Sequence, residues 1–169
     1  DLFQAELYLI SPITEAGRFL RKEYFLTSQQ RDIERQILKG IRQKHTGYYW
    51  FIGLPGTGKT LLLYDLAMKL SGRQKVCLIH CGRAGKEWRI LHERLRRIDY
   101  LSDEQIHENM DLSEYNGVLI DEAHLLSEEN LQMILQACGQ QPVIFSSDCE
   151  DMISPEELDQ NTVKAMRHL

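Results

Sequence analysis

The chain runs Gly53-Leu54-Pro55-Gly56-Thr57-Gly58-Lys59-Thr60 between two segments of opposite character, and this stretch decides its fold. Before it, the aromatic and β-branched residues 48–52 predict a buried strand. After it, the apolar residues 60–70 predict a helix. Glycines at such a junction let the backbone wrap closely around phosphate oxygens, whose charge is favoured by the N–H groups and by the helix N-terminus. We therefore expect this stretch to bind phosphate groups.

Each part of the loop has its own expected role. Residues 53–58 wrap the phosphates, Lys59 reaches the β- and γ-phosphates, and the Thr60 hydroxyl holds Mg²⁺. The bare pattern also occurs by chance, but here a strand and a helix flank it as the mechanism requires. The loop thus predicts a nucleoside triphosphate bound with Mg²⁺ in a P-loop α/β domain. The chain contains no guanine-specific Asn-Lys-x-Asp signature, which favours ATP.

A second motif ends the expected strand 117–121 in two carboxylates, Asp121 and Glu122. At the carboxyl end of a parallel strand both acids should lie beside the phosphate loop. We expect Asp121 to bind Mg²⁺ through water, and Glu122 to orient and polarise the attacking water. An Asp-Glu pair after a strand is commonly a solvated loop, but its combination with the phosphate loop favours a catalytic pair.

Other polar residues have two interpretations each. His124 either links the nucleotide state to a neighbouring segment or packs at a helix start. Ser147 and Asp148, with Ser146, end a strand at 142–146. A polar side chain there either senses the γ-phosphate or holds the attacking water, or these residues only form a cap or turn. Gln30 has an amide that suits an adenine edge, whereas a capping box with Thr27 explains it locally.

Strands and helices alternate along the chain, which predicts a three-layer fold with a mostly parallel sheet. Four strands are expected in the order 1-4-3-2; the four, in chain order, are 48–52, 76–80, 117–121 and 142–146. Helices are expected at 27–44, 60–70, 85–98 and 127–138, with a short one after Ser102-x-x-Gln105 and another starting at Ser154-Pro155-Glu156-Glu157. Residues 1–25 have no clear period and stay an unassigned lead-in, so we expect the P-loop domain to occupy 26–169.

Composition bounds the function. The chain has 169 residues, 43% of them hydrophobic and 27% charged, which is typical of a globular domain. No segment has the apolar length of a membrane span and no signal peptide is apparent, so we expect a cytoplasmic location without membrane contact. The four cysteines, at 77, 81, 138 and 149, lack paired C-x-x-C spacing and are expected to be reduced structural thiols.

Charge leaves the partner open. The formal net charge of -5 excludes a generally basic coat for nucleic acid. A local basic stretch around Trp88 is suited to a single-stranded nucleic-acid backbone; its members are Arg83, Lys86, Arg89, Arg94, Arg96 and Arg97. Because Glu87 and Glu93 interrupt this stretch, we favour a solvated helix face.

Four motifs together resemble the first RecA-like domain of superfamily 1 helicase-like ATPases, in its bacterial Schlafen-related branch. They are Leu26-Thr27-x-x-Gln30, the loop 53–60, Ile79-His80-Cys81-Gly82 and Asp121-Glu122-Ala123-His124. The resemblance covers residues 24–150. It implies adenine contact by Gln30, phosphate contact by Lys59, Mg²⁺ ligation by Thr60 and Asp121, and water activation by Glu122.

The chain departs from this family in two ways. Where such helicases have Gly-Asp-x-x-Gln, it has Ser147-Asp148-Cys149-Glu150-Asp151, so the coupling glutamine is missing. The family also uses a second RecA-like domain to supply arginine, which we expect in a longer protein. An arginine finger contributes about a thousandfold or more, so the chain alone should bind ATP well and hydrolyse it slowly.

Three functional hypotheses follow. The leading one is the ATPase core of a helicase-like or nucleic-acid-dependent motor. The alternative is an AAA+ or defence-signalling switch, which remodels a protein partner and takes its arginine from a neighbouring subunit. A nucleotide or small-molecule kinase is least favoured, because the adjacent Asp121 and Glu122 suit water activation better than transfer to an acceptor.

Overall fold

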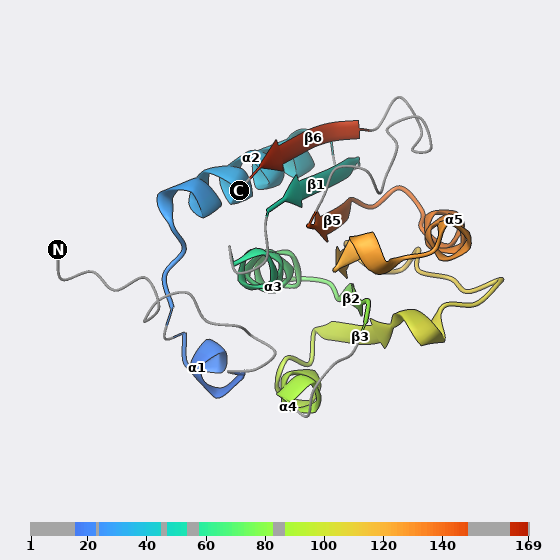
Figure 1. Cartoon of the computed structure of the whole chain (residues 1–169), viewed down its shortest axis with the longest axis horizontal. Helices are drawn as coiled ribbons and strands as arrows, with labels where there is room; N and C mark the ends of the chain where they lie inside the picture. The colour runs from blue at the N-terminus through green and yellow to red at the C-terminus, as the bar shows by residue number, and fades with distance from the viewer. Residues whose placement is uncertain are drawn as a thin grey trace, which may run out of the picture.

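In the computed structural model, which describes residues 16–22, 24–44, 47–53, 58–82, 87–148 and 163–168, one parallel sheet lies between two layers of helices (Figure 1). The elements follow in chain order: α1 (Ala16–Leu20), α2 (Ser28–Lys44), β1 (Tyr48–Ile52), α3 (Lys59–Leu70), β2 (Val76–His80), α4 (Glu87–Arg94), β3 (Ile98–Ser102), η2 (Asp103–Gln105), β4 (Val118–Asp121), η3 (Ala123–Leu125), α5 (Glu128–Ala137), β5 (Val143–Ser147) and β6 (Val163–His168).

The sheet has the strand order β3-β2-β4-β5-β1-β6, and each of its neighbouring pairs is parallel. Because all strands run the same way, the carboxyl ends of β1, β2, β4 and β5 meet at one edge. The register places His80 opposite Asp121 and Ile52 opposite Ser147. We call this edge the carboxyl edge; in open α/β sheets it is the usual place of a ligand site.

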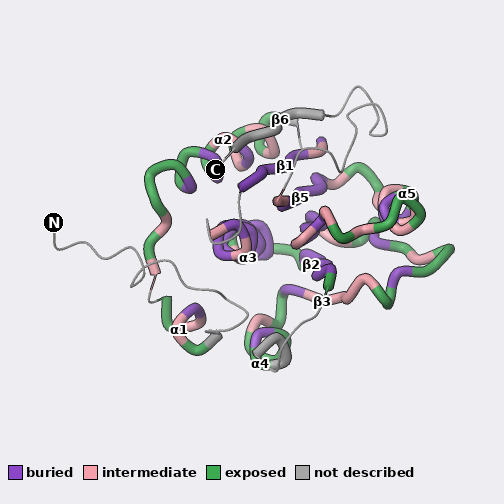
Figure 2. Tube along the Cα trace, viewed as in Figure 1, coloured by how far each residue is buried: buried purple, intermediate pink, exposed green. Residues whose placement is uncertain are grey.

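Alternating side chains along the strands enter two separate cores. On one face Tyr49, Phe51 and Leu78 pack with residues of α2 and α3. On the other face Trp50 and Ile79 pack with residues of α5. Figure 2 shows that α3 and the central strands are the most buried parts of the molecule. Burial on both faces explains why the strands are apolar runs, as parallel sheets require.

The predicted three-layer α/β class is confirmed. The four predicted strands form the centre of the sheet as β1-β5-β4-β2, which is the 1-4-3-2 order. The predicted number of four is wrong, because β3 and β6 add a strand at each edge. The capping box of Ser102 and Gln105 is present, and it starts the short 3₁₀ helix η2.

The β3 strand replaces the end of a predicted helix. We expected a helix over 85–98, whereas α4 ends at Arg94 and β3 begins at Ile98. Ile98 and Tyr100 are buried while Asp99 between them is only half-buried, so this segment alternates with the period of a strand. Pairing with the free edge of β2 outweighs the helical pattern of the charged residues before it.

The last strand, β6, had no counterpart in the sequence prediction. It pairs in parallel with the outer edge of β1, with a register shift between Tyr48 and Tyr49. A short segment containing two basic residues has little strand signal of its own. It is extended mainly because the edge of β1 offers backbone hydrogen-bond partners. The predicted helix start at Ser154-Pro155-Glu156-Glu157 lies outside the described residues.

Part of the unassigned lead-in contributes to the core. Phe19 of α1 is completely buried, stacks on Tyr24 at 5.2 Å and meets Tyr64 of α3 edge-on at 5.9 Å. Aromatic pairs at these separations add to the energy of area burial. Within the described part of the chain, no helix combines the length and apolar character that a membrane span needs.

Candidate nucleotide site

The predicted site residues that the structure describes gather around the carboxyl edge and the start of α3. Gly53 follows β1 and donates its N–H to Ser147 O at 3.1 Å, which joins the start of the loop to β5. Gly58 is the N-cap of α3 with φ 83°, a left-handed backbone that glycine adopts without strain. Leu54, Pro55, Gly56 and Thr57 lie outside the described residues.

Thr60 and Asp121 are in direct contact. The Thr60 hydroxyl, in the first turn of α3, lies 3.2 Å from Asp121 Oδ2 and 3.3 Å from Oδ1. The carboxylate belongs to the last residue of β4 and is fully buried. A hydroxyl beside a carboxylate is the hard oxygen donor set that Mg²⁺ prefers, so these two residues fit the predicted metal.

Neighbouring strands hold the buried carboxylate of Asp121 in place. Ser146 Oγ of β5 donates to Oδ1 at 2.9 Å, and the backbone N–H of Glu122 donates to the same atom at 3.1 Å. His80 Nδ1 of β2 lies 3.2 Å from Oδ2. A buried charge is tolerated when such partners replace its water, so Asp121 keeps a defined orientation beside Thr60.

His80 had no predicted role, and the contact of Ser146 with Asp121 was not predicted. Both residues were visible as polar side chains at the end of apolar strands. Their roles follow only from the register, which sets His80 directly opposite Asp121 and brings the end of β5 beside β4.

Glu122 differs from Asp121 in both backbone and environment. Its φ of 56° and ψ of 43° are left-handed, which is uncommon for a residue with a side chain and which occurs at functional turns. Burial, with the nearby charges of Asp121 and Asp148, raises the pKa of Glu122, while His124 and Lys59 act in the opposite direction. A carboxyl group with a raised pKa is a better proton acceptor near neutral pH.

Lys59 is paired within the site. Its ammonium group is almost completely buried and forms an ion pair with Asp148, the residue after β5. Since a phosphate group would need the same ammonium group, Asp148 occupies the cation that the loop is expected to offer to a ligand.

His124 joins two of the site carboxylates. Its Nδ1 accepts the backbone N–H of Asp148 at 3.2 Å, so the neutral ring carries its proton on Nε2. That Nε2 lies 3.1 Å from Glu122 Oε2 and 3.4 Å from Asp148 Oδ2. The resulting network runs from Lys59 through Asp148 and His124 to Glu122.

The same three side chains could be taken for a metal site. One ligand atom from each of Glu122, His124 and Asp148 lies within 4.8 Å of the others. A metal ligand, however, must offer a nitrogen lone pair, and a ligating histidine normally donates its other ring N–H to an acceptor. Here the other ring nitrogen, Nδ1, accepts a backbone N–H, so Nε2 is a donor and a hydrogen-bond network fits better.

Gln30 fulfils the local interpretation and also approaches the loop. It forms both bonds of the capping box: Thr27 N–H donates to Oε1 at 2.9 Å, and Gln30 N–H donates to Thr27 Oγ1 at 3.1 Å. Its Nε2 lies 3.4 Å from Gly58 O, and only 1% of the residue is exposed. Adenine contact by Gln30 stays a prediction.

The cysteines do not belong to this site's chemistry. Burial raises the pKa of Cys77, Cys81 and Cys138 to about 12, so they are protonated thiols at neutral pH. All three are unpaired, as expected, and Cys149 lies outside the described residues.

The structure describes only part of the basic stretch. Arg94 and Arg96 are exposed, but Arg97 Nη1 donates to Gly72 O at 2.8 Å in a structural contact. Arg83 and Lys86 lie outside the described residues, as do the side chains of Trp88 and Arg89. The solvated helix face that the sequence favours for this stretch stays a prediction.

Solved structures similar to this chain are helicase and ATPase domains. The Hef helicase domain of Pyrococcus furiosus aligns with a TM-score of 0.60 and 13% identity, over 90% of this chain and 39% of that chain. The UvsW helicase of bacteriophage T4 has a TM-score of 0.34 and 13% identity, over 96% of this chain and 54% of its own. The C-terminal part of the Fun30 ATPase domain has a TM-score of 0.36 and 15% identity, over 90% and 53%.

Of these three structures, the Hef helicase domain is the one with a TM-score above 0.5, and at 13% identity the likeness shows the fold alone: this chain shares a fold with that domain and spans 39% of its length. No protein-family model matches the chain, and no curated protein sequence does. The Schlafen-related branch stays a prediction from the sequence.

Proposed function

We propose that the chain is the Mg²⁺-dependent ATP-binding and ATP-hydrolysing core of a helicase-like, nucleic-acid-dependent motor. The observation that carries this proposal is the contact between Thr60 and Asp121, 3.2 Å apart at the junction of α3 and β4. Two oxygen ligands for Mg²⁺ from distant motifs lie side by side, next to a lysine at the start of the same helix. The helicase fold supports the motor over the other uses of a phosphate loop.

The chain's own residues divide the chemistry among them. Lys59 leaves Asp148 and binds the β- and γ-phosphates, while Thr60 and Asp121 hold Mg²⁺, which neutralises phosphate charge when bound. Glu122 accepts a hydrogen bond from the attacking water. The water oxygen bonds to the γ-phosphorus as the bond to the β–γ bridging oxygen breaks, and the water passes one proton to Glu122, which releases it to solvent, so that the products are ADP and phosphate.

His124 and Asp148 would couple this chemistry to the rest of the site. When a phosphate group takes Lys59, Asp148 loses its cation and shares the His124 N–H with Glu122. The proposal also requires a cation from a second RecA-like domain or a neighbouring subunit, because an arginine finger carries much of the rate in such sites. Hydrolysis by this chain alone is therefore slow.

The test is ATP binding and phosphate release, each measured with and without single-stranded DNA or RNA. The variants are Lys59→Ala and Glu122→Gln, with Lys39→Ala on the exposed side of α2 as the matched lysine control. We expect Lys59→Ala to lose ATP binding, Glu122→Gln to bind but not hydrolyse, and the control to behave as wild type.

Three results would count against the proposal. If Lys59→Ala binds ATP as tightly as wild type, the assignment of the phosphate site is wrong. If Glu122→Gln hydrolyses ATP at the wild-type rate, the assignment of water activation to Glu122 is wrong. If nucleic acid fails to stimulate a longer protein that contains this chain, the motor is excluded, and a switch acting on a protein partner becomes the better hypothesis.

A further inference from the structure

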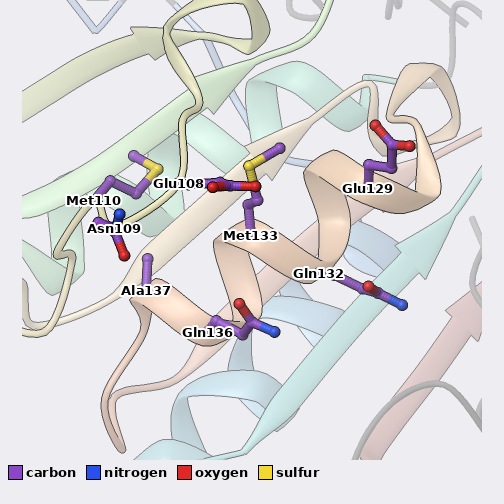
Figure 3. A pocket seen from close by; sticks show the side chains of 8 residues that line it. All are labelled: Glu108, Asn109, Met110, Glu129, Gln132, Met133, Gln136 and Ala137. Atoms are coloured by element: carbon purple, nitrogen blue, oxygen red, sulfur yellow. The ribbon is translucent and has the colours of Figure 1, made fainter.

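A pocket of about 620 Å³ opens between α5 and the loop that follows η2 (Figure 3). It belongs to the sheet face covered by α5, and its described lining contains no residue of the nucleotide site. Its volume is in the range of pockets that hold ligands.

The pocket has an apolar floor and a polar rim. Met110 of the loop, with Met133 and Ala137 of α5, borders the hydrophobic core beneath it. The rim carries two carboxylates, Glu108 and Glu129. Figure 3 shows Glu108 reaching from the loop toward α5, beside Met133. Three amide side chains complete the rim: Asn109, Gln132 and Gln136.

The charge of this lining selects a cation. Among the described residues that line the pocket, the two glutamates are the charged ones and no side chain is basic. A lysine or arginine side chain would lay its aliphatic stem on the methionines, which adapt readily in shape. Its charged head would then reach the carboxylates at the rim.

The amide side chains of the rim favour a peptide over a simple polyamine as the ligand. Glu129, Gln132 and Gln136 recur at intervals of three and four and so form a row along one side of α5. Each glutamine amide both donates and accepts, which matches the alternating C=O and N–H groups of a peptide backbone. A polyamine has only donors when it is protonated and would leave the amide N–H₂ groups without acceptors.

We propose that this pocket binds a basic peptide segment of a partner protein. An arginine or lysine of that segment lies over Met110 and Met133 and pairs with Glu108 and Glu129. The backbone of the segment follows the glutamine row of α5.

The test uses a capped pentapeptide with two arginines, titrated into the whole chain with ¹³C-labelled methionine methyl groups. The methyl signals of Met110 and Met133 should shift, while that of Met68 in α3 should stay. The same peptide with citrulline, which is neutral and nearly isosteric, should bind at least about fivefold more weakly, the scale of one solvent-accessible ion pair.

Matched charge variants distinguish peptide binding in the pocket from a general attraction between a basic peptide and an acidic protein. Glu108→Gln/Glu129→Gln should weaken peptide binding about tenfold, a loss of about 1.4 kcal/mol. Glu104→Gln/Glu128→Gln removes the same charge from exposed positions that do not line the pocket, and it should leave binding unchanged.

Three outcomes overturn the proposal. They are equal binding of the arginine and citrulline peptides, equal losses in the two double variants, and spermidine shifting the Met110 and Met133 signals at lower concentration than the peptide. The last result would identify a site for small polyamines instead.

Discussion

Replacing Glu34 with glutamine should remove a pH dependence from the stability of this chain. Glu34 of α2 is only 3% exposed and contacts the ammonium group of Lys69 of α3, which also lies 3.3 Å from Asp65. The Tyr24 hydroxyl donates to Asp65 at 2.6 Å. Two buried carboxyl groups thus share one ammonium group, and one of them is expected to keep its proton.

The structure indicates which carboxyl group holds the proton. Burial and the neighbouring Asp65 raise the pKa of Glu34 from 4.5 to about 8, although Lys69 opposes this. Burial alone would raise the pKa of Asp65. Hydrogen bonds with Glu34 and Tyr24 and the charge of Lys69 outweigh burial, so the pKa of Asp65 is lowered overall. We therefore expect Glu34 to keep its proton at neutral pH beside an ionised Asp65.

The sign of the effect follows from proton binding. Between pH 4.5 and about 8 the folded chain holds a proton on Glu34 that the unfolded chain has lost. The free energy of unfolding then falls as pH rises, by up to about 1.4 kcal/mol per pH unit, and levels off above the folded pKa. Glutamine keeps a donor and an acceptor at this position but cannot ionise, so Glu34→Gln should lack this slope.

Urea unfolding from pH 5.5 to 7.5, followed by circular dichroism, measures the difference. The advantage of Glu34→Gln over wild type should grow by about 2–3 kcal/mol across this range. Glu93→Gln, at an exposed position of α4, is the control for general charge effects and should run parallel to wild type. If Glu34→Gln also runs parallel to wild type, Glu34 is ionised in the folded chain and the assignment of the proton is wrong.

Three further predictions concern the carboxyl edge. Asp148→Asn frees Lys59 from its ion pair, so calorimetry should show ATP binding several-fold tighter, by about 1 kcal/mol; weaker binding would mean that Asp148 itself contacts the nucleotide. Gly82→Ala should destabilise the chain by about 1–3 kcal/mol in urea unfolding, because φ is 90° there and the added Cβ would lie 2.9 Å from Leu125 Cδ1; an unchanged midpoint would contradict this. ATP should bind far more weakly in EDTA than with Mg²⁺, and equal affinities would argue against the metal site.

The centre of the fold could be predicted because its signals are local. The loop between strand and helix, and the apolar runs of β2, β4 and β5, lie in short continuous segments. Alternation of strands and helices then leaves few topologies, and the 1-4-3-2 order is among them. The contact of Thr60 with Asp121 follows once β1 and β4 share a parallel sheet, because α3 then begins at the edge at which β4 ends.

The parts that were missed depend on contacts between distant segments. The β3 and β6 strands extend because the edges of β2 and β1 offer backbone partners. The alternation in β3 is short and follows a charged helical stretch, and β6 has little strand pattern of its own. The contact between the buried Glu34 and the exposed Lys69 joins two helices whose relative rotation cannot be predicted from either helix alone. His80 likewise becomes a partner of Asp121 only through the register of β2 against β4.

The charge at the carboxyl edge indicates what the site still requires. Among the described residues, the carboxylates of Asp121, Glu122 and Asp148 gather around one buried ammonium group, that of Lys59. A triphosphate would add more negative charge to an edge whose acids already outnumber its lysine. Coulomb repulsion at such short range is costly in a partly buried site, so the proposed triphosphate would need Mg²⁺ at Thr60 and Asp121, and its transition state would need a further cation. The same acids that would position Mg²⁺ and water create this demand, so a catalytic carboxyl edge would need an arginine from another domain or subunit to complete it.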